Sequence, residues 1–246
     1  MKIQFESDQA YQQEAILGVV DCFRGQSLQP DSITPVSQGD LELITDADAG
    51  SLSAVGNRLS LPHETLVKNL HDVQERNDLD DGVAFHQWGI KSKPELGSPD
   101  LFCPHYSVEM ETGTGKTYVY LRTIFELNKN YGFKKFLIVV PSVAIREGVM
   151  NSLRITKDHF AELYNRIPCE FTVYDSKKIT QLRQFASSNQ IQILVINIQA
   201  FRRKDHAVIF QDKDAFHGHL PIDLIRATRP IVIMDEPQSI DSTEGA

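Results

Sequence analysis

The sequence predicts an α/β fold with a mostly parallel sheet that is covered by helices on both faces. From Cys103 onward, short runs rich in β-branched residues alternate with helical stretches, which is the pattern of repeated βαβ units. The chain has 246 residues, of which 41% are hydrophobic. This is enough apolar material for a real core in one large or two small domains.

The alternating region lets us place strands and helices individually. Strands are predicted at 106–110, 135–140, 170–174, 191–196 and 230–234, where β-branched and aromatic residues are concentrated. Helices are predicted between them, at 116–130, 143–153, 176–188 and 221–228. Parallel strands end at one common edge, so functional residues should follow the strands there.

The first hundred residues follow a different pattern. A helix is predicted over 8–23 with Asp8 as its N-cap, and Gly25 ends it. Residues 25–60 mix Gly, Pro, Ser and Asp with short apolar stretches such as 41–44, which is consistent with loops and one hairpin. A second helix is predicted over 62–77, with Ser60 as a candidate N-cap. We therefore divide the chain into a helical segment (1–24), an acidic loop-rich insertion (25–102) and an α/β domain (103–246).

Charge and cysteine content exclude several classes of protein. The net charge of −8 is uneven: residues 1–115 carry 7 Lys and Arg against 19 Asp and Glu, or −12, while residues 116–246 carry 18 against 14, or +4. The basic half can still approach a phosphate backbone.

There is no run of 18 apolar residues and no apolar leader after Met1, so we expect a cytoplasmic protein without a membrane segment. Cys22, Cys103 and Cys169 are widely spaced, which favours reduced thiols over disulfides or zinc.

A glycine-rich turn lies between the predicted strand 106–110 and the predicted helix 116–130. Its sequence is Thr-Gly-Thr-Gly-Lys-Thr over 112–117. Glycines at 113 and 115 let the backbone N–H groups of Thr112 to Gly115 face an anion at a helix start. In such a loop Lys116 reaches the β- and γ-phosphates of ATP, and the Thr117 hydroxyl ligates Mg²⁺. Met110 replaces the first Gly of the general pattern, and Thr-Gly-Thr-Gly-Lys-Thr is the variant of helicase-type motors.

An apolar strand near the end of the sequence finishes in two adjacent carboxylates. Residues 231–238 read Ile-Val-Ile-Met-Asp-Glu-Pro-Gln. In a P-loop NTPase this is where the metal is held: Asp235 holds Mg²⁺, directly or through water, and Glu236 orients and deprotonates the attacking water. Alternate side chains of a strand point to opposite faces, so only one of the two carboxylates is expected to face the metal. Lys116, Asp235 and Glu236 are therefore the candidate catalytic residues, although an acidic strand-to-loop turn is the plain alternative.

Three segments together resemble a known family. Residues 110–120, 140–149 and 235–238 resemble motifs I, Ia and II of the restriction (Res) subunit of type III restriction-modification enzymes, a branch of the superfamily-two helicases. The sequence Asp-Glu-Pro-Gln is the most specific of these, since related motors carry other residues after Asp-Glu. The resemblance runs from about Phe5 to the last residues. It implies a RecA-like P-loop NTPase domain, incomplete at the C-terminus, that uses ATP and Mg²⁺.

The resemblance also implies roles for further residues. Gln12, in preference to Gln9, would be the glutamine of a Q-type motif that hydrogen-bonds the adenine edge, with an ordinary surface glutamine as the alternative. Ser142 and Arg146, after the strand at 135–140, would contact the nucleic-acid backbone, although Arg146 could equally be a plain surface charge. Further nucleic-acid contacts would come from a motif Ib segment that contains Asn197 and Gln199, and coupling of ATP hydrolysis to movement from Gln238.

By this resemblance the full-length enzyme would couple ATP hydrolysis to movement on double-stranded DNA and to cleavage, together with a methyltransferase (Mod) subunit. In such motors a strand bearing motif III and a second motor domain with a catalytic arginine follow the segment matched here. Because an arginine of this kind is worth about 10³ to 10⁵ in turnover, the isolated chain should hydrolyse ATP weakly or not at all. The alternatives are another superfamily-two helicase, a type I restriction motor, or a nonhydrolysing nucleotide-binding truncation.

Overall fold

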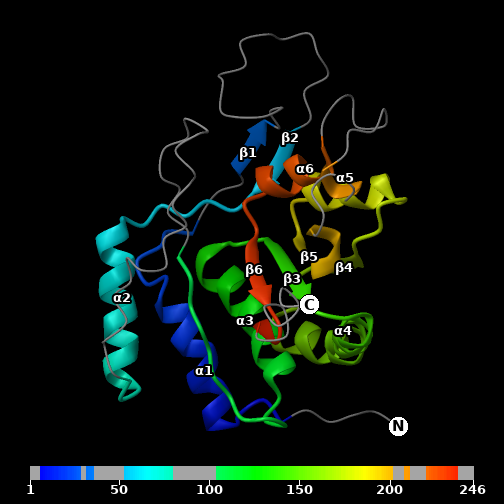
Figure 1. Cartoon of the computed structure of the whole chain (residues 1–246). Helices are drawn as coiled ribbons and strands as arrows, with labels where there is room; N and C mark the ends of the chain where they lie inside the picture. Colours follow the sequence, from blue (N-terminus) through cyan, green and yellow to red (C-terminus); the bar gives the residue numbers. More distant parts are fainter. Residues whose placement is uncertain are drawn as a thin grey trace, which may run out of the picture.

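A four-stranded parallel sheet forms the centre of the molecule (Figure 1). The structure is a computed structural model that describes residues 6–28, 32–35, 53–79, 104–201, 208–210 and 220–237. The sheet has the order β4-β5-β3-β6, with β3 at Lys135–Val140, β4 at Cys169–Val173, β5 at Ile191–Asn197 and β6 at Ile231–Met234. The predicted α/β fold with a parallel sheet is confirmed.

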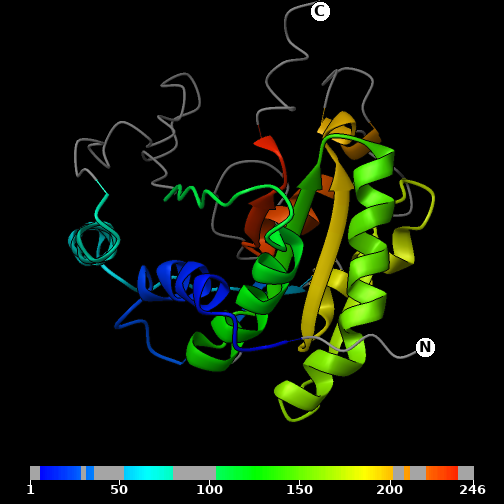
Figure 2. The same cartoon turned by 90° about the horizontal axis from the view of Figure 1, so that it is seen from below.

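Helices cover both faces of this sheet, and the alternation of side chains along β3 shows how (Figures 1 and 2). Phe136, Ile138 and Val140 belong to the cluster that includes residues of α3 (Lys116–Tyr131) and α4 (Val143–Leu163). Leu137 and Val139 belong to the cluster on the opposite face, which includes residues of α5 (Ile179–Ser187) and α6 (Pro221–Ala227). Because both faces of β3 and β5 are buried, these strands are nearly continuous apolar runs rather than alternating ones.

The prediction of a strand at 106–110 is wrong. These residues have no strand assignment and pair with none of the described strands. A strand needs a neighbour with which to exchange backbone hydrogen bonds, and β6, at one edge of the sheet, has β3 as its one partner among the described residues. Val232 and Met234 of β6 are 46% and 52% exposed, so that face of β6 is also not covered by any described segment.

Helix boundaries differ from the predictions at several points. α4 continues to Leu163, ten residues beyond the predicted end at 153, because no Gly or Pro interrupts the chain there. The capping predictions were wrong. α1 (Ala10–Asp21) has Gln9 rather than Asp8 at its N-cap, α2 (His63–Arg76) has Pro62 rather than Ser60, and neither N-cap residue makes a side-chain capping bond.

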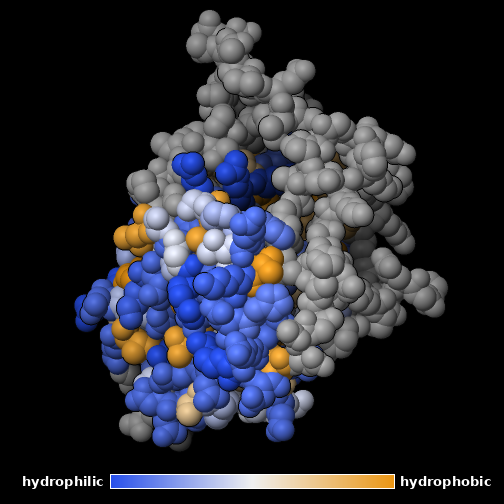
Figure 3. All heavy atoms as spheres, turned by 90° about the vertical axis from the view of Figure 1, so that its left-hand side faces the viewer, coloured by the Kyte–Doolittle hydropathy of each residue, from blue (hydrophilic) through white to orange (hydrophobic). Residues whose placement is uncertain are grey.

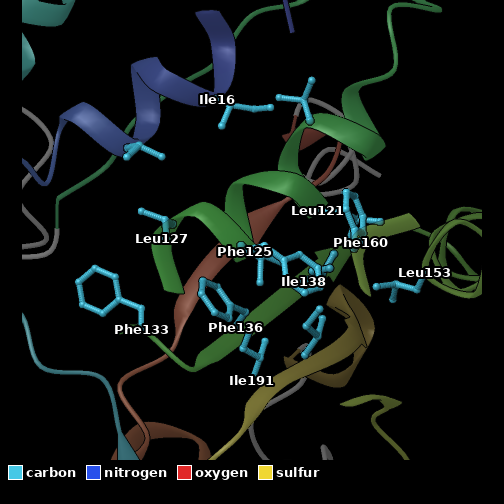
Figure 4. Close-up of a cluster of buried hydrophobic side chains, with 14 of the residues drawn as sticks. Ile16, Leu121, Phe125, Leu127, Phe133, Phe136, Ile138, Leu153, Phe160 and Ile191 are labelled. Carbon is cyan, nitrogen blue, oxygen red and sulfur yellow. The ribbon is translucent and has the colours of Figure 1, made fainter. Parts of the chain in front are cut away.

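α1 and α2 pack on the α3 side of the sheet, with α2 at the left of Figure 1. α1 buries Gln12, Ile16 and Val20, and Figure 4 shows Ile16 on α1 beside the side chains of α3. Asn69 of α2 donates hydrogen bonds to the backbone oxygens of Cys22 and Arg24, over 3.2 and 2.8 Å. From the side of α2, the described surface is largely hydrophilic with scattered hydrophobic spots, as expected for the outer faces of surface helices (Figure 3).

Part of the region assigned to an insertion at 25–102 is built into the core. β1 (Ser32–Pro35) and β2 (Ser53–Gly56) pair antiparallel, in agreement with the hairpin expected between 25 and 60, whereas residues 41–44 lie outside the described part of the chain. Asn57 then joins this pair to the sheet: its Nδ2 donates to the Lys135 backbone oxygen over 2.7 Å, and its Oδ1 accepts from the Lys134 N–H over 2.8 Å.

Lys135 is fully buried at the start of β3. Its Nζ donates to the backbone oxygens of Phe185 and Ser188 at the end of α5 and lies 5.5 Å from the centre of the Phe185 ring. Burial is the main cause that lowers the pKa of Lys135 from 10.5 to about 7. The ammonium therefore serves as a helix C-cap in a place where its charge is poorly solvated.

Two of the three cysteines lie in the described part of the chain. Cys22 and Cys169 are free thiols whose pKa is raised to about 12, mainly by burial, while Cys103 lies outside the described residues. Thiols of this kind are unreactive at neutral pH. Among the described residues, no helix is long and apolar enough to cross a membrane.

Candidate nucleotide-binding site

The glycine-rich turn ends in a left-handed residue that opens α3. Gly113 and Gly115 have φ angles of +84° and +86°, and Gly115 is the N-cap of α3. Such angles are readily adopted by glycine and strained for other residues. The Thr114 hydroxyl donates to the Glu111 backbone oxygen over 2.7 Å and closes the turn. Local sequence therefore determines the loop conformation that an anion would require.

Lys116 and Thr117 occupy the first turn of α3. The Lys116 side chain is exposed and Thr117 is half-buried. The backbone N–H groups of a first helical turn lack intrahelical partners, and the helix dipole adds partial positive charge there. An anion at this position would meet these N–H groups together with the Lys116 ammonium, which is the arrangement that binds a phosphate chain.

Asp235 lies at the carboxyl end of β6, directly beside β3. Its backbone N–H donates to the Val139 oxygen over 3.1 Å, which extends the β3–β6 ladder by one bond. Its side chain is half-buried, and Oδ2 accepts a hydrogen bond from the Tyr120 hydroxyl over 3.2 Å. Burial raises the pKa of Asp235, as does the Glu236 charge, whereas the Tyr120 bond and the Lys116 charge lower it. Lys116 is 119 positions from Asp235 in the sequence, yet in the fold it lies close enough for its charge to reach the Asp235 carboxyl.

Glu236 departs from regular strand geometry. It follows β6 with a φ of +54°, in the left-handed region that is costly for a residue with a Cβ, and its side chain is exposed. The backbone turns at this residue, so Asp235 and Glu236 have different surroundings, and which of the two faces a metal stays a prediction. Gln238 lies outside the described residues.

Gln12 is buried against the glycine-rich turn. Its Nε2 donates to the Thr114 backbone oxygen over 2.9 Å, and a Cβ added to Gly115 would lie 2.8 Å from the same nitrogen. The alternative of an exposed surface glutamine is wrong, since Gln12 is 7% exposed. The structure places Gln12 beside the loop, and its contact with adenine stays a prediction.

The candidate nucleic-acid residues lie near the carboxyl ends of β3 and β5. Ser142 is the N-cap of α4, where its hydroxyl accepts from the Ile145 N–H over 3.2 Å. Arg146 is 26% exposed and pairs with the neighbouring Glu147 over 2.8 Å, so its charge is partly compensated. Asn197 pairs with Val140 in the β3–β5 register.

Two amides beside this edge differ in their hydrogen bonding. Gln199, in the short 3-10 helix η3 (Ile198–Phe201), donates through Nε2 to the Pro141 oxygen over 2.8 Å, which links the two strand ends. The Asn197 Oδ1 is buried with no hydrogen-bond partner among the described residues. Buried polar atoms are rarely left without a partner, so Asn197 differs from an ordinary structural asparagine.

Tyr120 is the site residue that sequence reasoning missed. It follows Lys116 by four positions, so both lie on one side of α3. Helical spacing alone could have indicated this, but the contact with Asp235 depends on how α3 packs against β6, which no local pattern specifies.

The residues that converge here suit ATP and Mg²⁺. The Thr117 hydroxyl and the Asp235 carboxylate supply oxygen ligands, the type that Mg²⁺ prefers, and phosphates and water usually complete its shell. In the described part of the chain, no group of three or more His, Cys, Asp and Glu side chains could hold a metal ion. Thr117 and Asp235 are too few ligands to retain a metal ion by themselves, and the pair suits an ion that arrives already bound to a nucleotide.

The parallel α/β sheet, the glycine-rich turn at the start of α3 and the carboxylate at the end of β6 define the RecA-like class of P-loop NTPases. Within this class, the family described as "Type III restriction enzyme, res subunit" matches residues 102–239, which is more than half of the chain. The chain belongs to this family, which confirms the resemblance found in the sequence, and its fold is consistent with the helicase-like domain of such a restriction enzyme.

Three relatives support the same assignment. The EcoP15I Res subunit of Escherichia coli is 30% identical over 197 residues, which are 73% of this chain and 19% of that protein. The EcoPI Res subunit of Escherichia phage P1 is 31% identical over 201 residues, 74% of this chain and 19% of that protein. The StyLTI Res subunit of Salmonella typhimurium is 37% identical over 148 residues, 53% of this chain and 15% of that protein. The matches cover about a fifth or less of the relatives' own lengths.

Proposed function

We propose that this chain is the ATP-binding part of the DNA-dependent motor of a type III restriction enzyme. The observation that carries the proposal is the convergence of the glycine-rich turn and the end of β6, where α3, which begins at Lys116, contacts Asp235 through the Tyr120 hydroxyl over 3.2 Å. Residues 103–246 would form the first motor domain. Residues 1–24 would supply the Q-type segment that includes Gln12, and the buried position of Gln12 against Thr114 supports this.

The geometry suggests a division of roles within the site. Lys116 would bind the β- and γ-phosphates, and the N–H groups of residues 112–115 would cradle them. The Thr117 hydroxyl and the Asp235 carboxylate would hold Mg²⁺, which when bound neutralises charge on the phosphates. Glu236 would orient and deprotonate the attacking water. Its exposure and its separate backbone conformation suit a group that meets the substrate rather than the metal.

Double-stranded DNA is the proposed second ligand, and the basic half of the chain supports it. Ser142, Arg146, Asn197 and Gln199 would contact the DNA backbone near the ends of β3 and β5. Gln238, just after the Asp-Glu pair, would couple hydrolysis to movement. The relatives are named as subunits of restriction-modification enzymes, so we also propose a methyltransferase (Mod) partner and DNA cleavage by the full-length protein.

The proposed function is tested by ATP hydrolysis in the full-length protein with its Mod partner, with and without DNA. Lys116→Ala should lower DNA-stimulated turnover by about 100-fold or more, because it removes a charge that stabilises the transferring phosphoryl group. Glu236→Gln should lose hydrolysis to a similar degree while retaining nucleotide binding. Lys129→Ala is the matched control, since Lys129 is an exposed lysine at the other end of α3. Undiminished turnover in either site variant would contradict the assignment.

A further inference from the structure

The phenol of Tyr120 connects the two halves of the proposed nucleotide site. Its hydroxyl donates to Oδ2 of Asp235 over 3.2 Å, and the Thr117 side chain is its second hydrogen-bonding neighbour. Tyr120 is three positions after Thr117 on α3, so their side chains are neighbours on the helix surface. A single phenol therefore contacts both residues that would hold the metal.

The phenol donates to the carboxylate, because the oxygens of an ionised carboxylate can only accept. Its own oxygen keeps lone pairs that can accept a bond from the neighbouring Thr117 hydroxyl.

The direction matters for a magnesium site. A threonine hydroxyl that ligates a cation does so through oxygen lone pairs, and its proton then needs an acceptor. The Tyr120 oxygen is such an acceptor. The other oxygen of Asp235, Oδ1, makes no hydrogen bond that competes with a metal ligand among those found in the described residues.

Tyr120 is held in place independently of the site. Its ring packs against the hydrophobic core between α3 and the sheet. Asp235 is fixed at its backbone by the bond to Val139. Since the Tyr120 ring and the Asp235 backbone are both anchored, the hydrogen bond between them restricts the orientation of the Asp235 side chain.

We propose that Tyr120 is a positioning residue for the metal of the nucleotide site, which sets the Thr117 hydroxyl and the Asp235 carboxylate in place before Mg²⁺ arrives with ATP. The inference rests on the proposed function. Ligands that are ordered in advance bind more tightly because less conformational freedom is lost on binding. A phenylalanine at this position would keep the packing of the ring and lose both hydrogen bonds.

The test measures magnesium dependence rather than catalysis. The full chain is mixed with a fluorescent ATP analogue, and binding is followed with EDTA and then over a MgCl₂ titration. Tyr120→Phe should bind the analogue in EDTA within about twofold of wild type, and its half-saturating Mg²⁺ concentration should rise by about 10-fold, the expected effect of one lost charge-assisted bond.

Tyr174→Phe is the matched control, because it removes a buried phenol hydroxyl that has no hydrogen-bond partner among the described residues. Its magnesium dependence should equal that of the wild type. A Tyr120→Phe titration that overlays the wild-type curve would overturn the proposal. So would unfolding of Tyr120→Phe in a thermal melt, because the hydroxyl would then have a structural role.

Lys116→Ala separates this proposal from the proposed function. It should abolish binding of the analogue with or without Mg²⁺. Wild-type binding by Lys116→Ala would overturn the proposed function itself. Loss of binding in Lys116→Ala, combined with unchanged magnesium dependence in Tyr120→Phe, would overturn the role of Tyr120 alone. Nucleotide binding by the wild type that does not respond to Mg²⁺ would also overturn that role.

Discussion

The pair Gly113 and Gly115 allows the cost of backbone strain to be separated from the cost of crowding. Both have left-handed φ angles, +84° and +86°. A Cβ at Gly113 would meet nothing within 4 Å, whereas a Cβ at Gly115 would lie 2.8 Å from Nε2 of Gln12. Gly113→Ala and Gly115→Ala therefore share the conformational cost, and crowding against Gln12 is present in Gly115→Ala alone.

The magnitudes follow from these contacts. A left-handed non-glycine residue costs about 1 to 2 kcal/mol, which we expect for Gly113→Ala. Gly115→Ala must also displace the Gln12 amide from the Thr114 oxygen, a bond of 2.9 Å. Leaving buried polar groups without partners adds about 1 to 3 kcal/mol. We therefore expect Gly115→Ala to lose roughly 2 to 5 kcal/mol in total.

Urea denaturation, monitored by circular dichroism, measures the loss in free energy of unfolding for both variants on the same scale. Gln12→Ala provides a further check, since in that background the two glycine substitutions should cost the same within about 0.5 kcal/mol. Equal losses for Gly113→Ala and Gly115→Ala in the wild-type background would refute the reasoning. That result would mean that Gln12 moves aside freely and does not hold the loop.

Three further predictions concern buried polar groups. The folded-state pKa of Lys135, about 7, lies below its ordinary value of 10.5, so the unfolded chain binds more protons between these values. The free energy of unfolding should rise with pH across that window, by at most about 1.4 kcal/mol per pH unit, and Lys135→Met should flatten the rise in urea titrations at several pH values. Asn57→Ala should cost about 2 to 4 kcal/mol by the same method, because it leaves the Lys135 oxygen and the Lys134 N–H without their partner. The pKa of Asp235 is raised, so its charged form is disfavoured in the folded state. Asp235→Asn should raise the thermal midpoint of the nucleotide-free protein while it lowers magnesium-dependent nucleotide binding.

The sequence predicted the sheet well where strands are fully buried. β3 and β5 are continuous apolar runs, and their predicted bounds differ from the structure by at most one residue. The segment 106–110, Tyr-Ser-Val-Glu-Met, is less apolar than these strands and forms no ladder. Strand formation depends on a neighbour that local composition does not specify, whereas the hydrogen bonds of a helix lie within the segment itself.

The candidate site was predictable to the extent that it is local. The prediction of a turn at a helix start is correct for the glycine-rich segment, because positive φ angles favour glycine and glycine is visible in the sequence. The contacts of Gln12 with Thr114 and of Tyr120 with Asp235 span 102 and 115 positions, and no spacing rule connects such pairs. The caps expected at Asp8 and Ser60 failed for a related reason, since a suitable residue type does not fix where a helix begins.

α3 is the element through which the separate parts of the site are joined. Its first turn carries Lys116 and Thr117, its second turn carries Tyr120 against Asp235, and Arg122 donates to the Ser7 backbone oxygen just before α1. Arg122 also contacts the Tyr164 hydroxyl at the end of α4 over 3.3 Å. The hydrogen bonds of this one helix therefore connect the proposed nucleotide loop with β6, with the segment before α1 and with the end of α4.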